Sequence, residues 1–122
     1  MTKLTKAEEE IMQIIWQLGP CTVSDIRNYM EKEMGMSKPP HSTVSTFVRN
    51  LEEKGALDHK AYGRTYEYFP LISKEDYTGQ TLRKIVSDYF DGSMNRLVSF
   101  LVKEEDLSVK ELSDLLNRLE EE

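Results

Sequence analysis

Small hydroxylated residues stand close together in the middle of this chain, with an arginine and an asparagine just after them: Ser42, Thr43, Ser45, Thr46, Arg49 and Asn50. Short hydroxyl side chains let a backbone come close to another surface, whereas Arg and Asn reach base edges and phosphates. An ordinary solvated helix face favours Glu, Lys, Gln and Ala instead, because Thr costs some helix stability. The set is typical of a helix in a DNA major groove. An ordinary surface helix that contains some Thr is the alternative.

One amphipathic helix is predicted to position these side chains, and it runs from Pro39 to Gly55. Proline is tolerated in a first helical turn, and glycine commonly closes a helix. An apolar stripe at helical spacing is expected to face a core, and it consists of Val44, Phe47, Val48 and Leu51. The hydroxylated residues then lie on the opposite, exposed side.

Two shorter helices are predicted before it. Thr5 and Glu8 have the spacing of a capping box, and Gly19-Pro20 ends the helix that they open. Thr22 can cap a second helix, which the segment from Gly35 to Pro40 interrupts. Three helices joined by short turns, the last of them polar on one side, form the helix-turn-helix arrangement.

The periodicity becomes alternating after Gly55, which predicts a hairpin. Its strands are expected at about 57–61 and 65–69, around a turn that contains Gly63 and Arg64. A hairpin directly after a recognition helix is a wing. Arg64 at its tip, with His59 and Lys60 on its first strand, can contact phosphates or enter a minor groove. A polar hairpin tip without a partner is the alternative, and it fits His59 better than Arg64.

Three further short helices are predicted after a boundary at about residue 72, each with an apolar stripe. The residues expected to pair two chains are Leu82, Ile85, Tyr89, Leu97, Leu101, Leu112, Leu115, Leu116 and Leu119. Because about 50 residues rarely bury such stripes alone, a two-fold dimer is favoured over a monomer in which they fold back on the first region. The predicted domains are therefore residues 1–72, for DNA binding, and residues 73–122, for dimerisation.

Length and charge agree with a small helical DNA-binding protein. The chain has 122 residues, 39% of them apolar, and a net charge of −6. That charge is uneven: residues 1–70 hold 9 basic against 10 acidic residues, and residues 71–122 hold 7 against 12. Because charges are screened over about 10 Å, a local basic patch can bind DNA on an acidic protein. No membrane span or signal peptide is apparent, and a cytoplasmic location is expected.

The sequence contains few of the residue patterns that catalytic or metal-binding sites require. There is no nucleophile–base pairing and no glycine-rich phosphate loop, and the two histidines, His41 and His59, lie 18 residues apart without ligand spacing. The single cysteine, Cys21, excludes an internal disulfide and is interpreted as a small core residue. The chain is therefore expected not to be an enzyme and to need neither metal nor cofactor.

With these elements placed, the chain resembles the penicillinase repressor family of bacterial winged-helix regulators, the BlaI/MecI type. The similarity covers essentially the whole chain. The motifs that carry it are LTKAEEEIMQIIW, STVSTFVRNLEEKGAL, GRTYEYFPLISKEDY and GSMNRLVSFLVKEEDLS, together with the closing Glu- and Leu-rich helix. Their order and spacing together are far more specific than any one of them.

The resemblance implies a cytoplasmic, dimeric repressor with an N-terminal winged helix and a C-terminal helical dimerisation region. Members bind pseudo-palindromic operators, and many are inactivated when a membrane sensor of the metalloprotease type signals and the repressor is cut in its dimerisation region. By position, Lys38, Thr43 and Thr46 correspond to DNA contacts of the family, and Arg64 falls in the wing. The family name also suggests antibiotic resistance, although no residue identifies the inducing signal.

Departures from the family pattern affect three of its features. The usual arginine of the recognition helix corresponds to Asn50 here, with Arg49 one place earlier, about 100° around the helix. Arg49 is therefore expected to contact phosphate rather than the same base. The Asn-Phe pair at which the family is cut corresponds to Ser99-Phe100. The clustered cysteines of the copper-responsive branch are absent, so copper sensing of that kind is not expected.

The sequence thus predicts a mainly α protein with a small β-wing that represses transcription as a dimer bound to operator DNA. Derepression would follow when the dimerisation region is cut or loosened, because each half-site alone binds too weakly. Two other functions stay open: a winged-helix regulator that responds to a small ligand, and a winged helix that serves only protein–protein contact.

Overall fold

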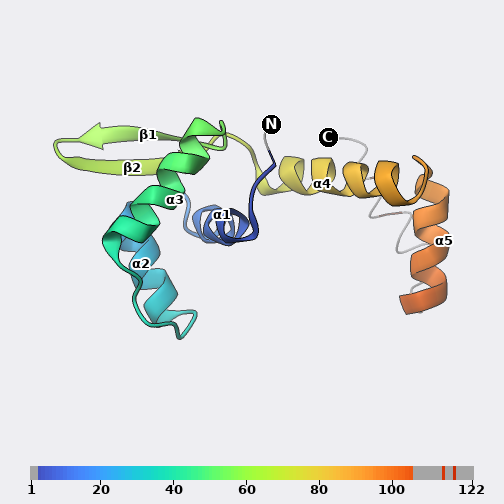
Figure 1. Cartoon of the computed structure of the whole chain (residues 1–122), viewed down its shortest axis with the longest axis horizontal. Helices are drawn as coiled ribbons and strands as arrows, with labels where there is room; N and C mark the ends of the chain where they lie inside the picture. The colour runs from blue at the N-terminus through green and yellow to red at the C-terminus, as the bar shows by residue number, and fades with distance from the viewer. Residues whose placement is uncertain (1–2, 106–113, 115–116, 118–122) are drawn as a thin grey trace. The chain divides into compact units, whose positions relative to one another are not determined.

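The computed structural model describes residues 3–105, 114 and 117, and no side-chain burial is described for 104 and 105. The chain separates into two compact units, Met1–Ser73 and Lys74–Glu122. The first unit holds helices α1 (Lys6–Leu18), α2 (Val23–Lys32) and α3 (His41–Glu53), then strands β1 (Leu57–Tyr62) and β2 (Thr65–Pro70). The second holds helices α4 (Lys74–Tyr89) and α5 (Met94–Glu105) (Figure 1). The protein is mainly helical, and its first unit is a winged helix-turn-helix.

The first two helices each begin at a complete capping box. The Thr5 hydroxyl accepts from the Glu8 backbone N–H at 3.2 Å, and Glu8 Oε1 accepts from the Thr5 N–H at 2.8 Å. Thr22 and Asp25 make the same reciprocal pair at the start of α2, at 3.1 and 2.9 Å. Because a helix start leaves backbone N–H groups unpaired, these side chains fix where each helix begins.

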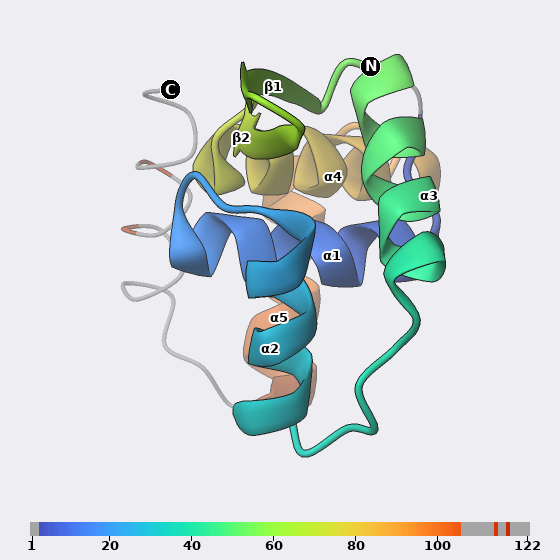
Figure 2. The same ribbon diagram turned by 90° about the vertical axis from the view of Figure 1, so that its left-hand side faces the viewer.

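Helix α3 is shorter than the predicted Pro39–Gly55 segment. It begins at His41, with Pro40 in the N-cap position and no side-chain cap. The Pro40 carbonyl instead accepts from the backbone N–H groups of Thr43 and Val44, at 3.1 and 3.4 Å. Figure 2 shows the long connection, which leaves the lower end of α2 and rises to the lower end of α3. The prolines therefore hold the connection outside the helix, and the hydroxylated residues occupy the first turns.

The wing is an antiparallel hairpin whose strands are one residue longer than predicted. Tyr62 pairs with Thr65, which leaves Gly63 and Arg64 as a two-residue turn. Gly63 has φ +63°, a left-handed conformation that glycine adopts without a steric penalty. Cys21, in the α1–α2 turn, adds an isolated bridge to Tyr68, with backbone hydrogen bonds of 2.9 and 2.7 Å. The wing is thereby attached to the helices at its base.

The core of the first unit lies between the three helices and the base of the wing. Its largest fully buried side chains include Ile11, Met12 and Ile15 of α1, Ile26 of α2, and Val44, Val48 and Leu51 of α3. Phe47, predicted on the buried stripe of α3, is only half-buried. Three of the four predicted stripe residues are therefore core, which turns the polar side of α3 to solvent.

The second unit buries little of its apolar surface among the described residues. Val86 and Leu97 are buried, whereas Tyr89 is 79% exposed and Phe100 49% exposed. The predicted sixth helix, with Leu112, Leu115, Leu116 and Leu119, lies outside the described residues. No helix in the described part of the chain is both long and apolar enough to cross a bilayer.

Candidate nucleic-acid interface

The hydroxylated face of α3 is exposed over three turns. Ser42, Thr43, Thr46, Arg49 and Asn50 are all solvent-exposed, and Ser45 is half-buried. Residues three, four and seven apart share one side of a helix, so Thr43, Thr46 and Asn50 form one row beside a second row of Ser42, Ser45 and Arg49. The predicted contact residues on this helix therefore form one continuous polar surface.

Local hydrogen bonds orient part of this surface. The Thr46 hydroxyl donates to the Ser42 carbonyl at 2.9 Å, and Arg49 Nε donates to the Ser45 carbonyl at 3.3 Å. His41 Nδ1 and the Ser45 hydroxyl lie 3.2 Å apart. Each of these contacts spans four residues, and in the first two the donor lies one turn after the acceptor. The Arg49 guanidinium therefore lies along the hydroxylated residues, and its remaining N–H groups can donate to a ligand.

Two long-range contacts hold α3 in place at its ends. Arg27 of α2 donates from Nε to the Pro39 carbonyl at 2.8 Å, which fixes the entry to the helix. Just after the helix, Lys54 Nζ lies 2.6 Å from Glu8 Oε1, and Glu8 is only 3% exposed. Burial raises the pKa of Glu8, but hydrogen bonds from Lys54 and Thr5 outweigh burial and hold that pKa below its ordinary value. These contacts connect the two ends of α3 to both other helices.

The wing tip and α3 meet around a polar hollow of about 200 Å³. Arg64, His41 and Ser45 line it together with Thr22 and Ser24 from the start of α2; the other lining residues are Val23, Thr65, Tyr66 and Tyr68. The first backbone N–H groups of a helix and an arginine side chain both favour an anion. Arg64, from the tip of the wing, is therefore brought to the same surface as the start of α3.

Lys38 is exposed in the connection that precedes α3, and Lys60 is exposed on β1. Both are free to extend from the surface, although Lys60 lies on the sheet face opposite His59, since strand residues alternate. Both lysines are therefore accessible to a ligand.

His59, predicted as a phosphate-contacting group of the wing, faces α3 instead. Its imidazole stacks on Tyr66 with ring centroids 4.2 Å apart, and its Nδ1 makes a short contact with Glu52 Oε1. Tyr68 lies on the same sheet face, with its ring centroid 5.6 Å from that of His59. Burial and the charge of Glu52 raise the pKa of the Tyr68 hydroxyl, and Arg49 opposes them. His59 therefore joins the wing to the end of α3.

The predicted dimerisation residues that the structure describes are partly accessible. On α4, Ile85 is 39% exposed and Tyr89 79% exposed, whereas Leu82 is half-buried. On α5, Leu97 is buried and Leu101 is half-buried. The predicted cleavage pair, Ser99 and Phe100, is exposed but lies inside α5 rather than in a loop.

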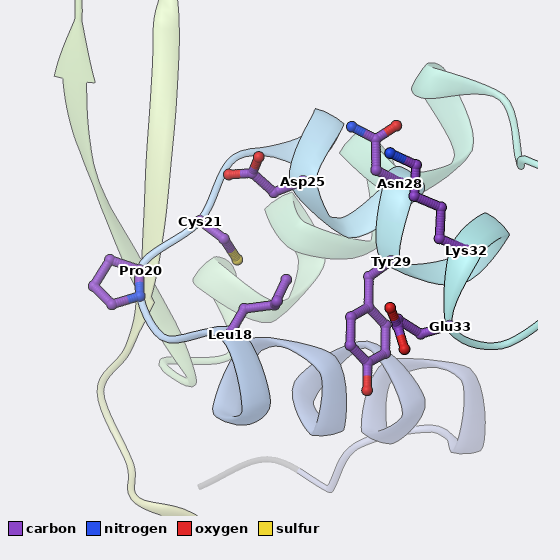
Figure 3. A pocket seen from close by; sticks show the side chains of 8 residues that line it. All are labelled: Leu18, Pro20, Cys21, Asp25, Asn28, Tyr29, Lys32 and Glu33. Atoms are coloured by element: carbon purple, nitrogen blue, oxygen red, sulfur yellow. The ribbon is translucent and has the colours of Figure 1, made fainter.

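A second pocket, of about 290 Å³, lies between the end of α1 and the outer side of α2 (Figure 3). Its lining mixes apolar and charged groups: Leu18, Pro20, Cys21, Asp25, Asn28, Tyr29, Lys32 and Glu33. Cys21 is buried, and burial raises the pKa of its thiol to about 12, with the charges of Asp25 and Glu67 adding to the effect. The thiol is therefore protonated at neutral pH, in agreement with the interpretation as a small core residue.

Sequence reasoning missed two features of this surface. The clamp between Lys54 and Glu8 joins residues 46 positions apart, and no local pattern marks it. The second feature is a group of possible metal-ligating atoms from Glu52, Asp58 and His59, all within 4.8 Å of one another. The adjacent Asp58-His59 pair was visible in the sequence, but the strand register that turns His59 toward α3 was not.

Comparison with known proteins identifies the family of this chain. The model of the family described as Penicillinase repressor matches residues 4–121. The chain is 28% identical to the penicillinase repressor of Bacillus licheniformis over 119 residues, covering 98% of this chain and 91% of the relative. It is also 28% identical over 117 residues to the methicillin resistance regulatory protein MecI of Staphylococcus aureus, covering 96% and 93%.

Two solved structures of the repressor BlaI are also similar in sequence to part of this chain. The solution structure of the DNA-binding domain of the repressor BlaI is 30% identical, with a TM-score of 0.49, and covers 61% of this chain and 90% of that one. The monomeric form of the Bacillus licheniformis BlaI in complex with the blaP half-operator is also 30% identical, with a TM-score of 0.49 and coverages of 62% and 89%. Since the family model spans nearly the whole sequence, the chain belongs to the penicillinase repressor family.

Proposed function

We propose that this protein is a transcriptional repressor that binds operator DNA through α3 and the wing. Membership of the penicillinase repressor family supports a DNA-binding repressor rather than an enzyme. The exposed, hydroxylated face of α3 is the observation that selects the DNA-reading surface. Small side chains there let the helix backbone approach the floor of a major groove, which a face of Glu and Lys would not allow.

The length of each side chain and its position on α3 determine which part of the DNA we expect it to contact. Thr43 and Thr46 lie in the first two turns of α3 and contact base edges, with Asn50 on the same row. Ser42 is short and near the helix start, so it hydrogen-bonds to phosphate. Arg49 is directed along the helix by its bond to Ser45 and also contacts phosphate.

Two basic groups outside α3 contact the DNA backbone. Lys38 approaches it from the connection before α3, and Arg64 approaches it from the wing tip. The hollow beside Arg64 fits one phosphate between the wing and the start of α2. These contacts position the protein, and the row on α3 supplies the sequence preference.

Residues 1–72 act as the DNA-binding domain in this proposal, and residues 73–122 act as the dimerisation domain. Ile85 and Tyr89 lie four residues apart on α4, where one side of the helix is exposed and apolar. A two-fold dimer covers that side and places two copies of α3 in successive major grooves, about 34 Å apart. Tethering two half-sites raises affinity through effective concentration, so the dimer controls repression.

Release of the repressor then requires only the loss of dimerisation. A membrane sensor protease that cuts between Ser99 and Phe100 would divide α5 and leave the DNA-reading residues intact. Both side chains are exposed, but a protease needs an extended substrate, so α5 must open locally before the cut. The exposed Phe100 ring contacts Phe90, with ring centroids 5.7 Å apart, and this contact must also be lost.

The first test is a titration of the purified full chain against a labelled fragment of its own upstream region. It is done at two salt concentrations, with unrelated DNA as competitor. Binding that resists the competitor and saturates at two chains per fragment supports the dimeric repressor. Equal loss to the competitor, or no binding, favours a protein-contact module or a ligand-responsive regulator, for which the pocket beside α2 is the first place to examine.

Substitutions on α3 test the assigned surface. Thr43→Ala and Thr46→Ala should each weaken operator binding by about 1–3 kcal/mol, the cost of one lost base contact. Both residues are exposed, so the thermal midpoint should stay close to that of the wild type. Gln13→Ala, on the exposed side of α1, is the matched control and should bind normally. Wild-type affinity in both threonine variants would place the DNA on another surface.

A further inference from the structure

Three ligand-type side chains meet where the end of α3 faces the first strand of the wing. Glu52 comes from the last turn of α3, and Asp58 and His59 come from β1. One carboxylate oxygen from each acid and an imidazole nitrogen all lie within 4.8 Å of one another. From this geometry we propose that Glu52, Asp58 and His59 form a binding site for one divalent transition-metal ion such as Zn²⁺.

The distances suit an ion with little rearrangement. Zn²⁺ lies about 2.0–2.2 Å from nitrogen and carboxylate ligands, so two ligand atoms on one ion are at most about 4.2 Å apart. Glu52 Oε1 and His59 Nδ1 are in direct contact, so this pair must open slightly to take an ion between the two atoms. Asp58 is exposed and its Oδ1 accepts from the His59 backbone N–H at 2.8 Å, so a small shift of this carboxylate completes the set.

The imidazole is held in a fixed orientation. His59 stacks on Tyr66 at 4.2 Å with an interplanar angle of 21°, and Tyr68 lies against it at 5.6 Å. This packing restricts rotation of the ring and keeps Nδ1 toward Glu52. A preoriented ligand loses less conformational entropy on binding than a freely rotating one does. The side chains of His59 and Glu52 are 29% and 32% exposed, so an ion can enter while part of its water shell is lost.

The charges also favour a cation here. Glu52 and Asp58 contribute two negative charges, and the two cations nearest in sequence to Glu52 each have another partner, although the charge of Arg49 also acts on Tyr68 beside His59. Arg49 donates back along α3 to Ser45, and Lys54 is paired with Glu8. An imidazole with two carboxylates suits a borderline ion such as Zn²⁺ better than a purely oxygen-binding ion such as Ca²⁺.

The site joins the two elements of the proposed DNA surface, but metal binding is measured without DNA and stands independently of it. Isothermal titration of the metal-free full chain with Zn²⁺ should show one site, and Zn²⁺ should raise the unfolding midpoint followed by fluorescence of Trp16, the only tryptophan. His59→Gln should weaken Zn²⁺ binding by more than about tenfold, since losing even an outer partner of a ligand costs that much.

The second histidine supplies the matched control. His41→Gln, at the start of α3, should bind Zn²⁺ as the wild type does. Asp58→Asn alters only an exposed side chain, so it keeps the test decisive if His59→Gln fails to fold, and it too should weaken binding. No Zn²⁺ binding by the wild type, or equal affinity in Asp58→Asn or folded His59→Gln, overturns the site and leaves a simple contact between Glu52 and His59.

Discussion

Removal of the Lys54 ammonium should destabilise the first unit strongly, and Lys54→Met tests this. Lys54 Nζ lies 2.6 Å from Glu8 Oε1, and the Glu8 side chain is 4% exposed, so the variant leaves a buried carboxylate without its cation. Such a loss costs about 3–5 kcal/mol for a fully buried pair. Lys54 is 25% exposed and Glu8 keeps the hydrogen bond from the Thr5 N–H, which reduces the expected cost to about 2–3 kcal/mol.

This cost is large for a unit of this size. The unit runs from Met1 to Ser73, and stabilities of about 0.05–0.15 kcal/mol per residue give it a total of about 4–11 kcal/mol. The midpoint of thermal unfolding should therefore fall by about 10–20 °C, since small domains lose about 4–8 °C per kcal/mol. Urea unfolding followed by Trp16 fluorescence reports the unit selectively, because Trp16 is the only tryptophan and its indole donates to the Ile72 carbonyl.

The pH dependence provides a second, independent reading of the same pair. The folded pKa of Glu8 is lowered, so its stabilising contribution is present above the ordinary value of about 4.3 and is lost as the pH falls through the folded pKa. In Lys54→Met the cation is missing, so burial raises the pKa of Glu8. Protonation of Glu8 then removes the cost of burying an unpaired carboxylate. The difference in free energy of unfolding between the wild type and the variant should therefore decrease as the pH falls from 7 to 4.

The exposed Lys60 supplies the control, and Lys60→Met should change the free energy of unfolding by less than about 0.5 kcal/mol. An equally small loss of unfolding free energy in Lys54→Met would refute the role of the buried pair. A difference from the wild type that does not vary with pH would refute it as well.

Three further outcomes are expected. Arg64→Ala should weaken binding to all DNA sequences alike and reduce the slope of log affinity against log salt by about 0.9, one phosphate contact; an unchanged slope would move the wing off the backbone. Cys21 should resist iodoacetamide at pH 8 in the native protein and react on unfolding, because its thiol pKa is about 12; rapid native alkylation would contradict its burial. Tyr89→Glu should shift the protein toward monomer in sedimentation experiments, whereas Gln80→Glu, also exposed on α4, should not; an unchanged dimer would place the interface elsewhere.

The sequence determined the elements of the first unit because their signals are local. The capping box at Thr5 and the N-cap residue Thr22 marked two helix starts, and period-two alternation marked the hairpin. Such signals depend on neighbours within four residues, and they fold the same way in most contexts. The polar face of α3 was readable for the same reason, since helical spacing alone separates it from Val44, Val48 and Leu51.

The ends of elements were less well determined. Helix α3 begins two residues after its predicted start. Pro40 takes the N-cap position, and its carbonyl accepts the first backbone hydrogen bonds of the helix. Phe47 has the spacing of a core residue but is half-buried, since burial depends on what packs against the helix and not on period alone.

Only the tertiary structure decided which distant side chains meet. The pair of Glu8 with Lys54, the bond from Arg27 to the Pro39 carbonyl, and the place of His59 against Glu52 all depend on how helices and wing pack. A one-residue change of strand register would have turned His59 to the other face of the sheet. Local sequence specifies each element, whereas contacts between elements depend on the sum of many weak packing interactions along the whole chain, which no single motif encodes.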